Sequence, residues 1–197
     1  MTDVLAPTPA GIARAADLLR GGAVVALPTD TVYGVAVSER EQLPTLFALK
    51  QRPVDKRIPM LVADLSQVTG ADDRARALAA RFWPGALTLV LPGPEDTDES
   101  QAFRAPDHPV ALDLIRATGP LYVTSANRSG EPETLGADDV LIAFATDQDE
   151  LAAILDGGAV PGGVASTVVD LSVTPARILR EGPITREQLE ALVDLVP

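Results

Sequence analysis

Short apolar runs rich in β-branched residues alternate with amphipathic helical segments along nearly the whole chain, and this alternation limits the fold more than any other feature. Strands are predicted at 23–27, 58–63, 87–91, 121–124, 151–155, 167–170 and 177–179, and helices at 9–20, 46–50, 73–82, 109–117, 138–144 and 185–193. Because strands and helices follow one another in this way in α/β proteins, we expect an α/β fold.

The length of 197 residues suits one domain, spanning residues 1–197, with a substantial core. The Pro-, Asp- and Glu-rich stretch 92–100 is predicted to be a solvent-exposed loop within that domain rather than a linker. No apolar run approaches the length of a membrane span, and the N-terminus lacks a signal-peptide pattern. We therefore expect a cytoplasmic protein with no membrane contact.

Residue usage excludes several kinds of catalysis. The chain has no cysteine and a single histidine, His108, so thiol chemistry and metal sites built from Cys or His clusters are excluded. No GxSxG or GxGxxG motif is present, and the glycine-containing stretch 157–167 lacks the Lys-Ser/Thr pair of a P-loop. His108 lies between Asp107 and Pro109, where we expect it to cap or order a turn.

Positive charge is concentrated in one short segment. The formal net charge is −12, which disfavours direct binding to a nucleic-acid backbone. Yet residues 50–57 hold four of the sixteen basic residues, including the chain's only lysines, Lys50 and Lys56. Two explanations remain open: a general preference for arginine that spared two surface lysines, or a need for compact ammonium groups beside an anionic ligand.

Hydroxyl and amide groups gather in predicted loops. Ser125 and Asn127 follow a predicted strand and precede a Ser-Gly turn, a composition that is also common in ordinary turns. Phosphoryl chemistry depends mainly on positioning and charge neutralisation, so it can proceed without His or Cys where Lys, Arg and Mg²⁺ converge. The composition therefore tolerates phosphoryl transfer better than most reactions.

Seven segments, taken in order, resemble the YrdC family of L-threonylcarbamoyladenylate synthases. They are Pro28-Thr-Asp-Thr-Val-Tyr-Gly34, Lys50-Gln-Arg-Pro-Val-Asp-Lys56, Phe82-Trp-Pro-Gly-Ala-Leu-Thr88, Arg104-Ala-Pro-Asp-His108, Thr124-Ser-Ala-Asn-Arg-Ser-Gly130, Ser166-Thr-Val168 and Leu179-Arg-Glu-Gly182. The resemblance implies a twisted, open, largely parallel or mixed sheet flanked by helices, with a concave basic cavity. Because the chain ends soon after the last segment, it resembles the short, single-domain form.

The resemblance also implies a reaction and a set of site residues. The family joins L-threonine and bicarbonate into a carbamate, which attacks the α-phosphorus of ATP to give threonylcarbamoyl-AMP and pyrophosphate. Mg²⁺ would accompany ATP, with no metal bound by the protein itself, and the product would pass to partner proteins that complete N6-threonylcarbamoyladenosine in tRNA. By resemblance, Thr31, Arg104, Ser125 and Ser166 contact threonine; Arg52, Lys56, Ser100, Asn127, Thr134 and Arg180 contact ATP; and Lys50 and Arg52 are catalytic.

Several positions depart from the family pattern, and one of them concerns a threonine contact. Many members carry a threonine-contacting histidine where this chain has Leu61. The alternative is an RNA-binding paralogue without adenylate-forming activity, which the negative net charge makes secondary because little or no direct RNA binding is expected.

Overall fold

A computed structural model describes residues 1–51, 58–93, 99–146 and 150–196. Along these residues the elements are β1 (Asp3–Leu5), α1 (Pro9–Arg20), β2 (Val24–Leu27), β3 (Gly34–Val37), η1 (Arg40–Gln42), α2 (Leu43–Lys50), β4 (Met60–Leu61), η2 (Leu65–Gln67), α3 (Asp73–Phe82), β5 (Leu87–Pro92), β6 (Ser100–Arg104), α4 (Pro109–Thr118), β7 (Leu121–Ser125), α5 (Ala137–Ala143), β8 (Leu151–Leu155), β9 (Thr167–Asp170), β10 (Arg177–Arg180) and α6 (Arg186–Glu190). The α/β class is confirmed.

All the described strands join one sheet in the order β1-β8-β2-β3-β7-β4-β6-β5-β9-β10. Four neighbouring pairs are parallel, namely β1 with β8, β2 with β8, β4 with β6, and β5 with β9. The other five pairs are antiparallel. The sheet is therefore mixed, which confirms the prediction of an open, largely parallel or mixed sheet flanked by helices.

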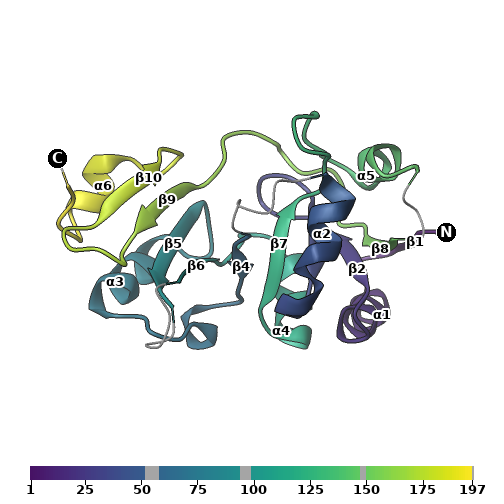
Figure 1. The fold of residues 1–197 in the computed structure, drawn as a ribbon, viewed down its shortest axis with the longest axis horizontal. Helices are drawn as coiled ribbons and strands as arrows, with labels where there is room; N and C mark the ends of the chain where they lie inside the picture. Colours follow the sequence, from purple (N-terminus) through teal and green to yellow (C-terminus); the bar gives the residue numbers. More distant parts are fainter. Residues whose placement is uncertain (52–57, 94–98, 147–149, 197) are drawn as a thin grey trace.

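Helices cover both faces of the half of the sheet formed by β1, β8, β2, β3 and β7 (Figure 1). Along β2, Val25 and Leu27 pack with α1 and α4, whereas Val24 and Ala26 pack with α2 and α5. Because successive strand residues point to opposite faces, an uninterrupted apolar run is the pattern expected of a strand buried on both sides. A third cluster joins α3 and α6 to β5 and β9.

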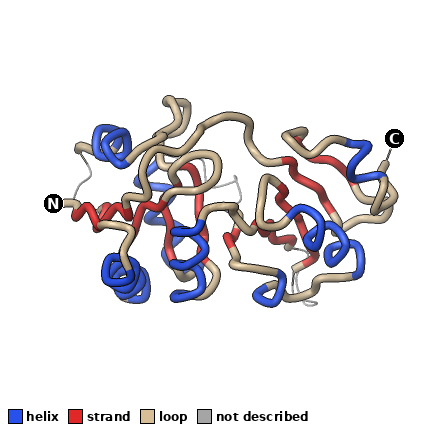
Figure 2. Tube along the Cα trace, turned by 180° about the vertical axis from the view of Figure 1, so that it is seen from behind, coloured by secondary structure: helices blue, strands red, loops and turns tan. Residues whose placement is uncertain are grey.

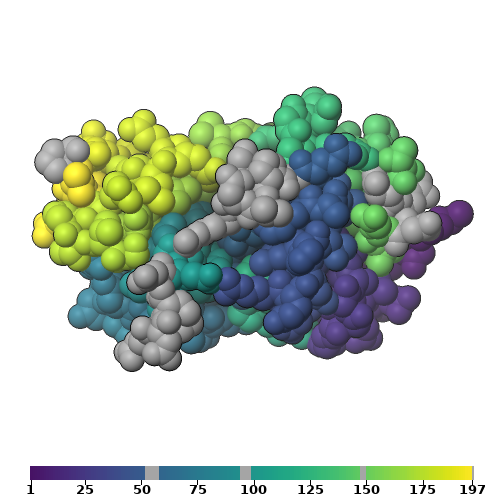
Figure 3. All heavy atoms as spheres, in the orientation of Figure 1, coloured from purple at the N-terminus to yellow at the C-terminus, as the bar shows by residue number. Residues whose placement is uncertain are grey.

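The molecule is elongated, and the two ends of the chain lie at its opposite ends (Figures 1 and 2). The space-filling view shows the N-terminal and C-terminal segments as separate purple and yellow regions (Figure 3). The segment 156–166 crosses between the halves of the sheet, from the end of β8 to the start of β9. No described helix is long and apolar enough to cross a bilayer.

Most predicted elements are present, but their limits differ where pairing is non-local. The short strands β1, β3 and β6 were not predicted, and the run 58–63 forms only the two-residue strand β4. The last helix ends at Glu190 instead of residue 193, because the chain beyond it pairs with Ala176. Its predicted N-cap, Thr185, is confirmed and belongs to a capping box with Gln188.

Candidate functional site

A cavity of about 400 Å³ opens at the middle of the sheet. Strands β3 to β7 and β9, the loop after β2 and the end of segment 156–166 contribute to its walls. Its lining residues are Thr29, Thr31, Val32, Tyr33, Gly34, Pro59, Leu61, Thr88, Ala102, Arg104, Val123, Thr124, Ser125, Glu133, Gly163, Ala165, Ser166, Val168 and Arg180. Two arginines, one carboxylate and several hydroxyls therefore face one space.

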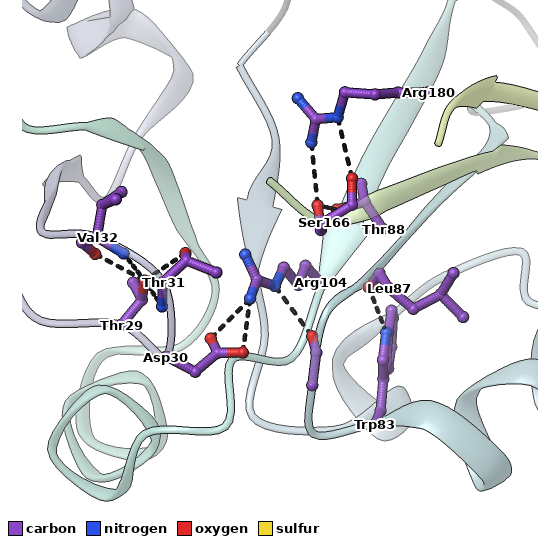
Figure 4. A network of polar contacts seen from close by, with 11 residues as sticks. Thr29, Asp30, Thr31, Val32, Trp83, Leu87, Thr88, Arg104, Ser166 and Arg180 are labelled. Carbon is purple, nitrogen blue, oxygen red and sulfur yellow. Dashed lines mark hydrogen bonds and ion pairs between the residues drawn. The ribbon is translucent and has the colours of Figure 1, made fainter. Parts of the chain in front are cut away.

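The loop between β2 and β3 presents Thr31 to this cavity. Thr29, which is buried, organises the loop: its Oγ1 donates to the Val32 carbonyl at 2.7 Å and accepts from the Thr31 backbone N–H at 3.2 Å. The Thr29 and Thr31 hydroxyls are 3.1 Å apart (Figure 4). At the end of the loop, a Cβ on Gly34 would lie 2.5 Å from Val123 Cγ1, so only glycine fits there without a shift. The loop is thus fixed tightly against β7.

Arg104, at the end of β6, is held by the partly buried carboxylate of Asp30. Its Nη2 donates to both oxygens of Asp30 at 2.7 Å, and its Nε donates to the Gly85 carbonyl at 3.0 Å (Figure 4). The two charged side chains are only 10% and 16% exposed. A charge pair that is shielded from water is screened weakly, so Asp30 largely neutralises Arg104 and fixes its orientation.

Arg180, on the edge strand β10, is held by neutral oxygens. Its Nε donates to the Ser166 carbonyl at 2.9 Å and its Nη2 to Ser166 Oγ at 3.1 Å. Ser166 Oγ also lies 2.8 Å from the Thr88 hydroxyl (Figure 4). Burial lowers the pKa of the Arg180 guanidinium, and the positive charge of Arg104 lowers it further. The two arginines therefore act on the same region of the cavity.

Lys50 is buried beneath the loop that follows β7. Its Nζ donates to the backbone oxygens of Ser125 and Asn127, at 2.5 Å for Asn127, and lies 3.3 Å from both Ser125 Oγ and Asn127 Oδ1. The Asn127 amide also donates to the Glu131 carbonyl at 2.7 Å. Within the described residues, the contacts of Lys50 thus shape the loop that brings Ser125 to the cavity.

The structure brings some predicted site residues together and leaves others apart. All four predicted threonine contacts, Thr31, Arg104, Ser125 and Ser166, line the cavity, as does Arg180. Lys50, Ser100, Asn127 and Thr134 are not among the lining residues. Arg52 and Lys56 lie outside the described residues. Buried Thr134 donates to the Ala126 carbonyl at 3.0 Å, so it supports the same loop as Lys50.

Several polar residues of the site were not assigned from the sequence, among them Asp30, Thr88 and Glu133. Asp30 and Thr88 hold Arg104 and Ser166, and Glu133 is the only carboxylate among the described lining residues. Asp30 lies inside the first quoted segment and Thr88 ends the third, so the segments themselves were the available signal. Leu61, which is buried, lines the wall as an apolar group.

His108 lies outside the cavity lining. It is the N-cap residue of α4, as the sequence predicted, although its side chain makes no cap hydrogen bond. Its buried Nδ1 has no hydrogen-bond partner in the described part of the chain. Burial lowers the pKa of the imidazole, while the charges of Asp30 and Asp107 oppose that shift.

Fold and site together define an open-sheet α/β protein with a cationic central cavity. The family model Sua5_yciO_yrdC, described as "Telomere recombination", matches residues 17–182. The chain belongs to this family, and the resemblance found in the sequence is confirmed.

Known relatives agree in sequence and in fold. A threonylcarbamoyl-AMP synthase of Bacillus subtilis is 42% identical over 98% of this chain and 59% of its own length. A threonylcarbamoyl-AMP synthase of Chromohalobacter salexigens is 38% identical over 81% of this chain and 92% of its own length. The structure of P. abyssi Sua5 complexed with L-threonine superposes with a TM-score of 0.87, at 33% identity over 100% of this chain and 63% of that one. The chain thus spans less than two thirds of the Bacillus and P. abyssi proteins.

Proposed function

We propose that the chain is an L-threonylcarbamoyladenylate synthase, which makes threonylcarbamoyl-AMP and pyrophosphate from L-threonine, bicarbonate and ATP. The observation that carries this proposal is the convergence of Thr31, Arg104, Ser125 and Ser166 on one cavity together with Arg180. The relatives named as threonylcarbamoyl-AMP synthases, and the threonine complex of one structural neighbour, support the same reaction.

The proposed chemistry has two steps. The threonine amine attacks the carbon of bicarbonate, and a C–N bond forms as water leaves to give the carbamate. A carbamate oxygen then attacks the α-phosphorus of ATP, the bond to the bridging oxygen breaks, and pyrophosphate leaves. Negative charge builds up at the phosphoryl group in the second step, where fixed cations lower the barrier most.

Each part of the cavity has a role in this scheme. Arg104 binds the threonine carboxylate, with Thr31, Ser125 and Ser166 offering hydroxyl groups to the same substrate. Arg180 faces the phosphates of ATP, because it carries a positive charge that no described carboxylate pairs. Lys50 supports the Ser125–Asn127 loop, and its direct action on the reacting groups, with that of Arg52, stays a prediction. So do ATP contacts from Lys56, Ser100, Asn127 and Thr134.

Mg²⁺ would arrive with the phosphates of ATP. Among the described residues, no group of three His, Asp or Glu side chains is arranged to hold a metal ion. Proteins that transfer the threonylcarbamoyl group to tRNA would take the product. We expect the reaction in the cytoplasm, where ATP and tRNA are available.

The RNA-binding alternative is not favoured. The chain carries a formal charge of −12, and of the two arginines that line the cavity, Arg104 is paired with Asp30. An RNA-binding surface normally presents many exposed cations on one face. RNA binding that weakens steeply with salt, without turnover of ATP, would favour the alternative instead.

The direct test is product formation. Purified protein is incubated with labelled ATP, Mg²⁺, threonine and bicarbonate, and threonylcarbamoyl-AMP and pyrophosphate are separated by chromatography. Omitting threonine or bicarbonate should abolish the product, as should Lys50→Ala if that variant still folds. A folded protein that binds ATP but makes no adenylate would contradict the proposal.

A further inference from the structure

Asp30 lies behind Arg104 and does not itself line the cavity. Both of its oxygens accept from Arg104 Nη2 at 2.7 Å, and its side chain is only 16% exposed. The neighbouring Nη1 of Arg104 has no hydrogen-bond partner among the described residues, so it remains available to a ligand. At this corner the cavity offers hydrogen-bond donors whose net charge is close to zero.

The Arg180 corner has the opposite character. Its guanidinium is ordered only by the two oxygens of Ser166, which are neutral, and within the described residues it forms no salt bridge. The unneutralised positive charge in this part of the cavity is therefore concentrated at Arg180. Glu133 is exposed at the cavity wall and pairs with neither arginine among the described contacts.

We propose that Asp30 is a specificity-determining residue that keeps phosphate groups away from the Arg104 corner and so reserves it for the amino-acid carboxylate. This inference rests on the proposed function. A pyrophosphate or triphosphate group carries several negative charges, so its binding depends steeply on the local potential. A single carboxylate carries only one negative charge, so oriented hydrogen-bond donors can bind it without a net positive charge beside it. With both arginines uncompensated, phosphates would bind at either corner.

The test compares two ligands on three proteins by isothermal titration calorimetry. The wild type, Asp30→Asn and Asp170→Asn are titrated with L-threonine and with inorganic pyrophosphate. Asp170 is the matched control because it also pairs an arginine, Arg177 at 3.2 Å, outside the cavity lining. In Asp30→Asn the uncompensated Arg104 should tighten pyrophosphate binding by roughly ten-fold, the size expected for one close charge. Threonine affinity should rise by a smaller factor, because its single carboxylate is balanced by its own ammonium group, and pyrophosphate should now displace threonine.

A second pair of variants keeps the test decisive if Asp30→Asn does not fold. Asp30→Asn/Arg104→Gln replaces the charge pair with neutral groups of similar shape, whereas Arg180→Gln removes the unpaired cation. The double variant should keep pyrophosphate affinity within about two-fold of the wild type, and Arg180→Gln should lose about ten-fold. Equal losses in these two proteins would overturn the inference, as would an unchanged ratio of threonine to pyrophosphate affinity in folded Asp30→Asn. A wild type that binds no threonine would instead count against the proposed function.

Discussion

Arg104 and Arg180 face the same cavity, but the protein holds them in different ways. Arg104 is bound to a partly buried carboxylate and a backbone carbonyl, whereas Arg180 is bound to the carbonyl and hydroxyl of one serine. Both are oriented by at least two hydrogen bonds, so orientation does not distinguish them. The difference is charge: one corner is compensated and the other is not, which lets one small cavity treat a carboxylate and a polyphosphate differently.

Replacing each arginine in turn and measuring stability tests whether the two corners differ in charge compensation. Arg104→Gln leaves Asp30, which is only 16% exposed, without its charged partner, and this should lower the free energy of unfolding by about 3 kcal/mol. Arg180→Gln leaves only neutral oxygens that face the cavity and relieves repulsion from Arg104, so the change should stay within about 1 kcal/mol. Urea denaturation of both variants measures the difference.

The double variant Asp30→Asn/Arg104→Gln is the control for that stability measurement. Because it removes both charges together, most of the stability lost in Arg104→Gln should return. Equal destabilisation by the two single variants would show that the carboxylate does not distinguish the two corners.

Turnover, unlike stability, should depend strongly on Arg180. Arg180→Gln should lower kcat/KM for ATP by roughly 10²-fold, because a fixed cation near the developing phosphoryl charge is lost. Arg177→Gln is the matched control, since Arg177 lies on the same strand, pairs with Asp170 and does not line the cavity. Steady-state assays of pyrophosphate release measure both variants. A comparable loss in Arg177→Gln would point to damage of β10 rather than to charge.

Thr88 tests whether the Arg180 corner depends on hydroxyl contacts. Thr88→Val keeps the shape of the side chain but removes the hydroxyl 2.8 Å from Ser166 Oγ, so Ser166 and with it Arg180 lose a fixed partner. We expect roughly a ten-fold lower kcat/KM for ATP, equivalent to about one hydrogen bond. Thr88→Ser keeps the hydroxyl and should restore most of the activity. Equal losses in the two variants would assign the effect to packing within β5.

The sequence predicted some parts of this architecture well. Helices at Pro9–Arg20 and Asp73–Phe82 were predicted closely, because each has a strong local start signal and an apolar face. Strands β1, β3 and β6 were missed, because three to five residues gain strand structure only from partners far away in sequence. The mixed sheet follows from the same pairings.

The site could be predicted only through the resemblance to the family. Five residues predicted as substrate contacts meet at the cavity, although each comes from a different strand or loop. The partners that hold them, Asp30 and Thr88, carry no signal of their own, since an aspartate or threonine in a loop or strand is common. Their roles depend on contacts 74 and 78 residues apart in the chain.

The smallest expected effect concerns Tyr33, which lies in the same loop as Asp30. This buried hydroxyl donates to the Gly158 carbonyl at 2.8 Å and accepts from the Gly157 N–H at 3.1 Å, so it ties the Asp30 loop to segment 156–166. Burial raises the pKa of Tyr33 to about 12, against about 10 in an unfolded chain. A raised pKa means that its contribution is complete below pH 10 and is lost between about pH 10 and 12.

Tyr33→Phe should therefore lower the free energy of unfolding by about 1 kcal/mol at pH 8, and this difference from the wild type should shrink above pH 10. Tyr122→Phe, which changes the only other tyrosine and leaves the loop contacts intact, is the control. Denaturant titrations from pH 8 to 11 follow both variants. A difference that stays constant across that range would mean that the Tyr33 hydroxyl does not hold the loop in place. The orientation of Arg104 would then depend on Asp30 and Gly85 alone.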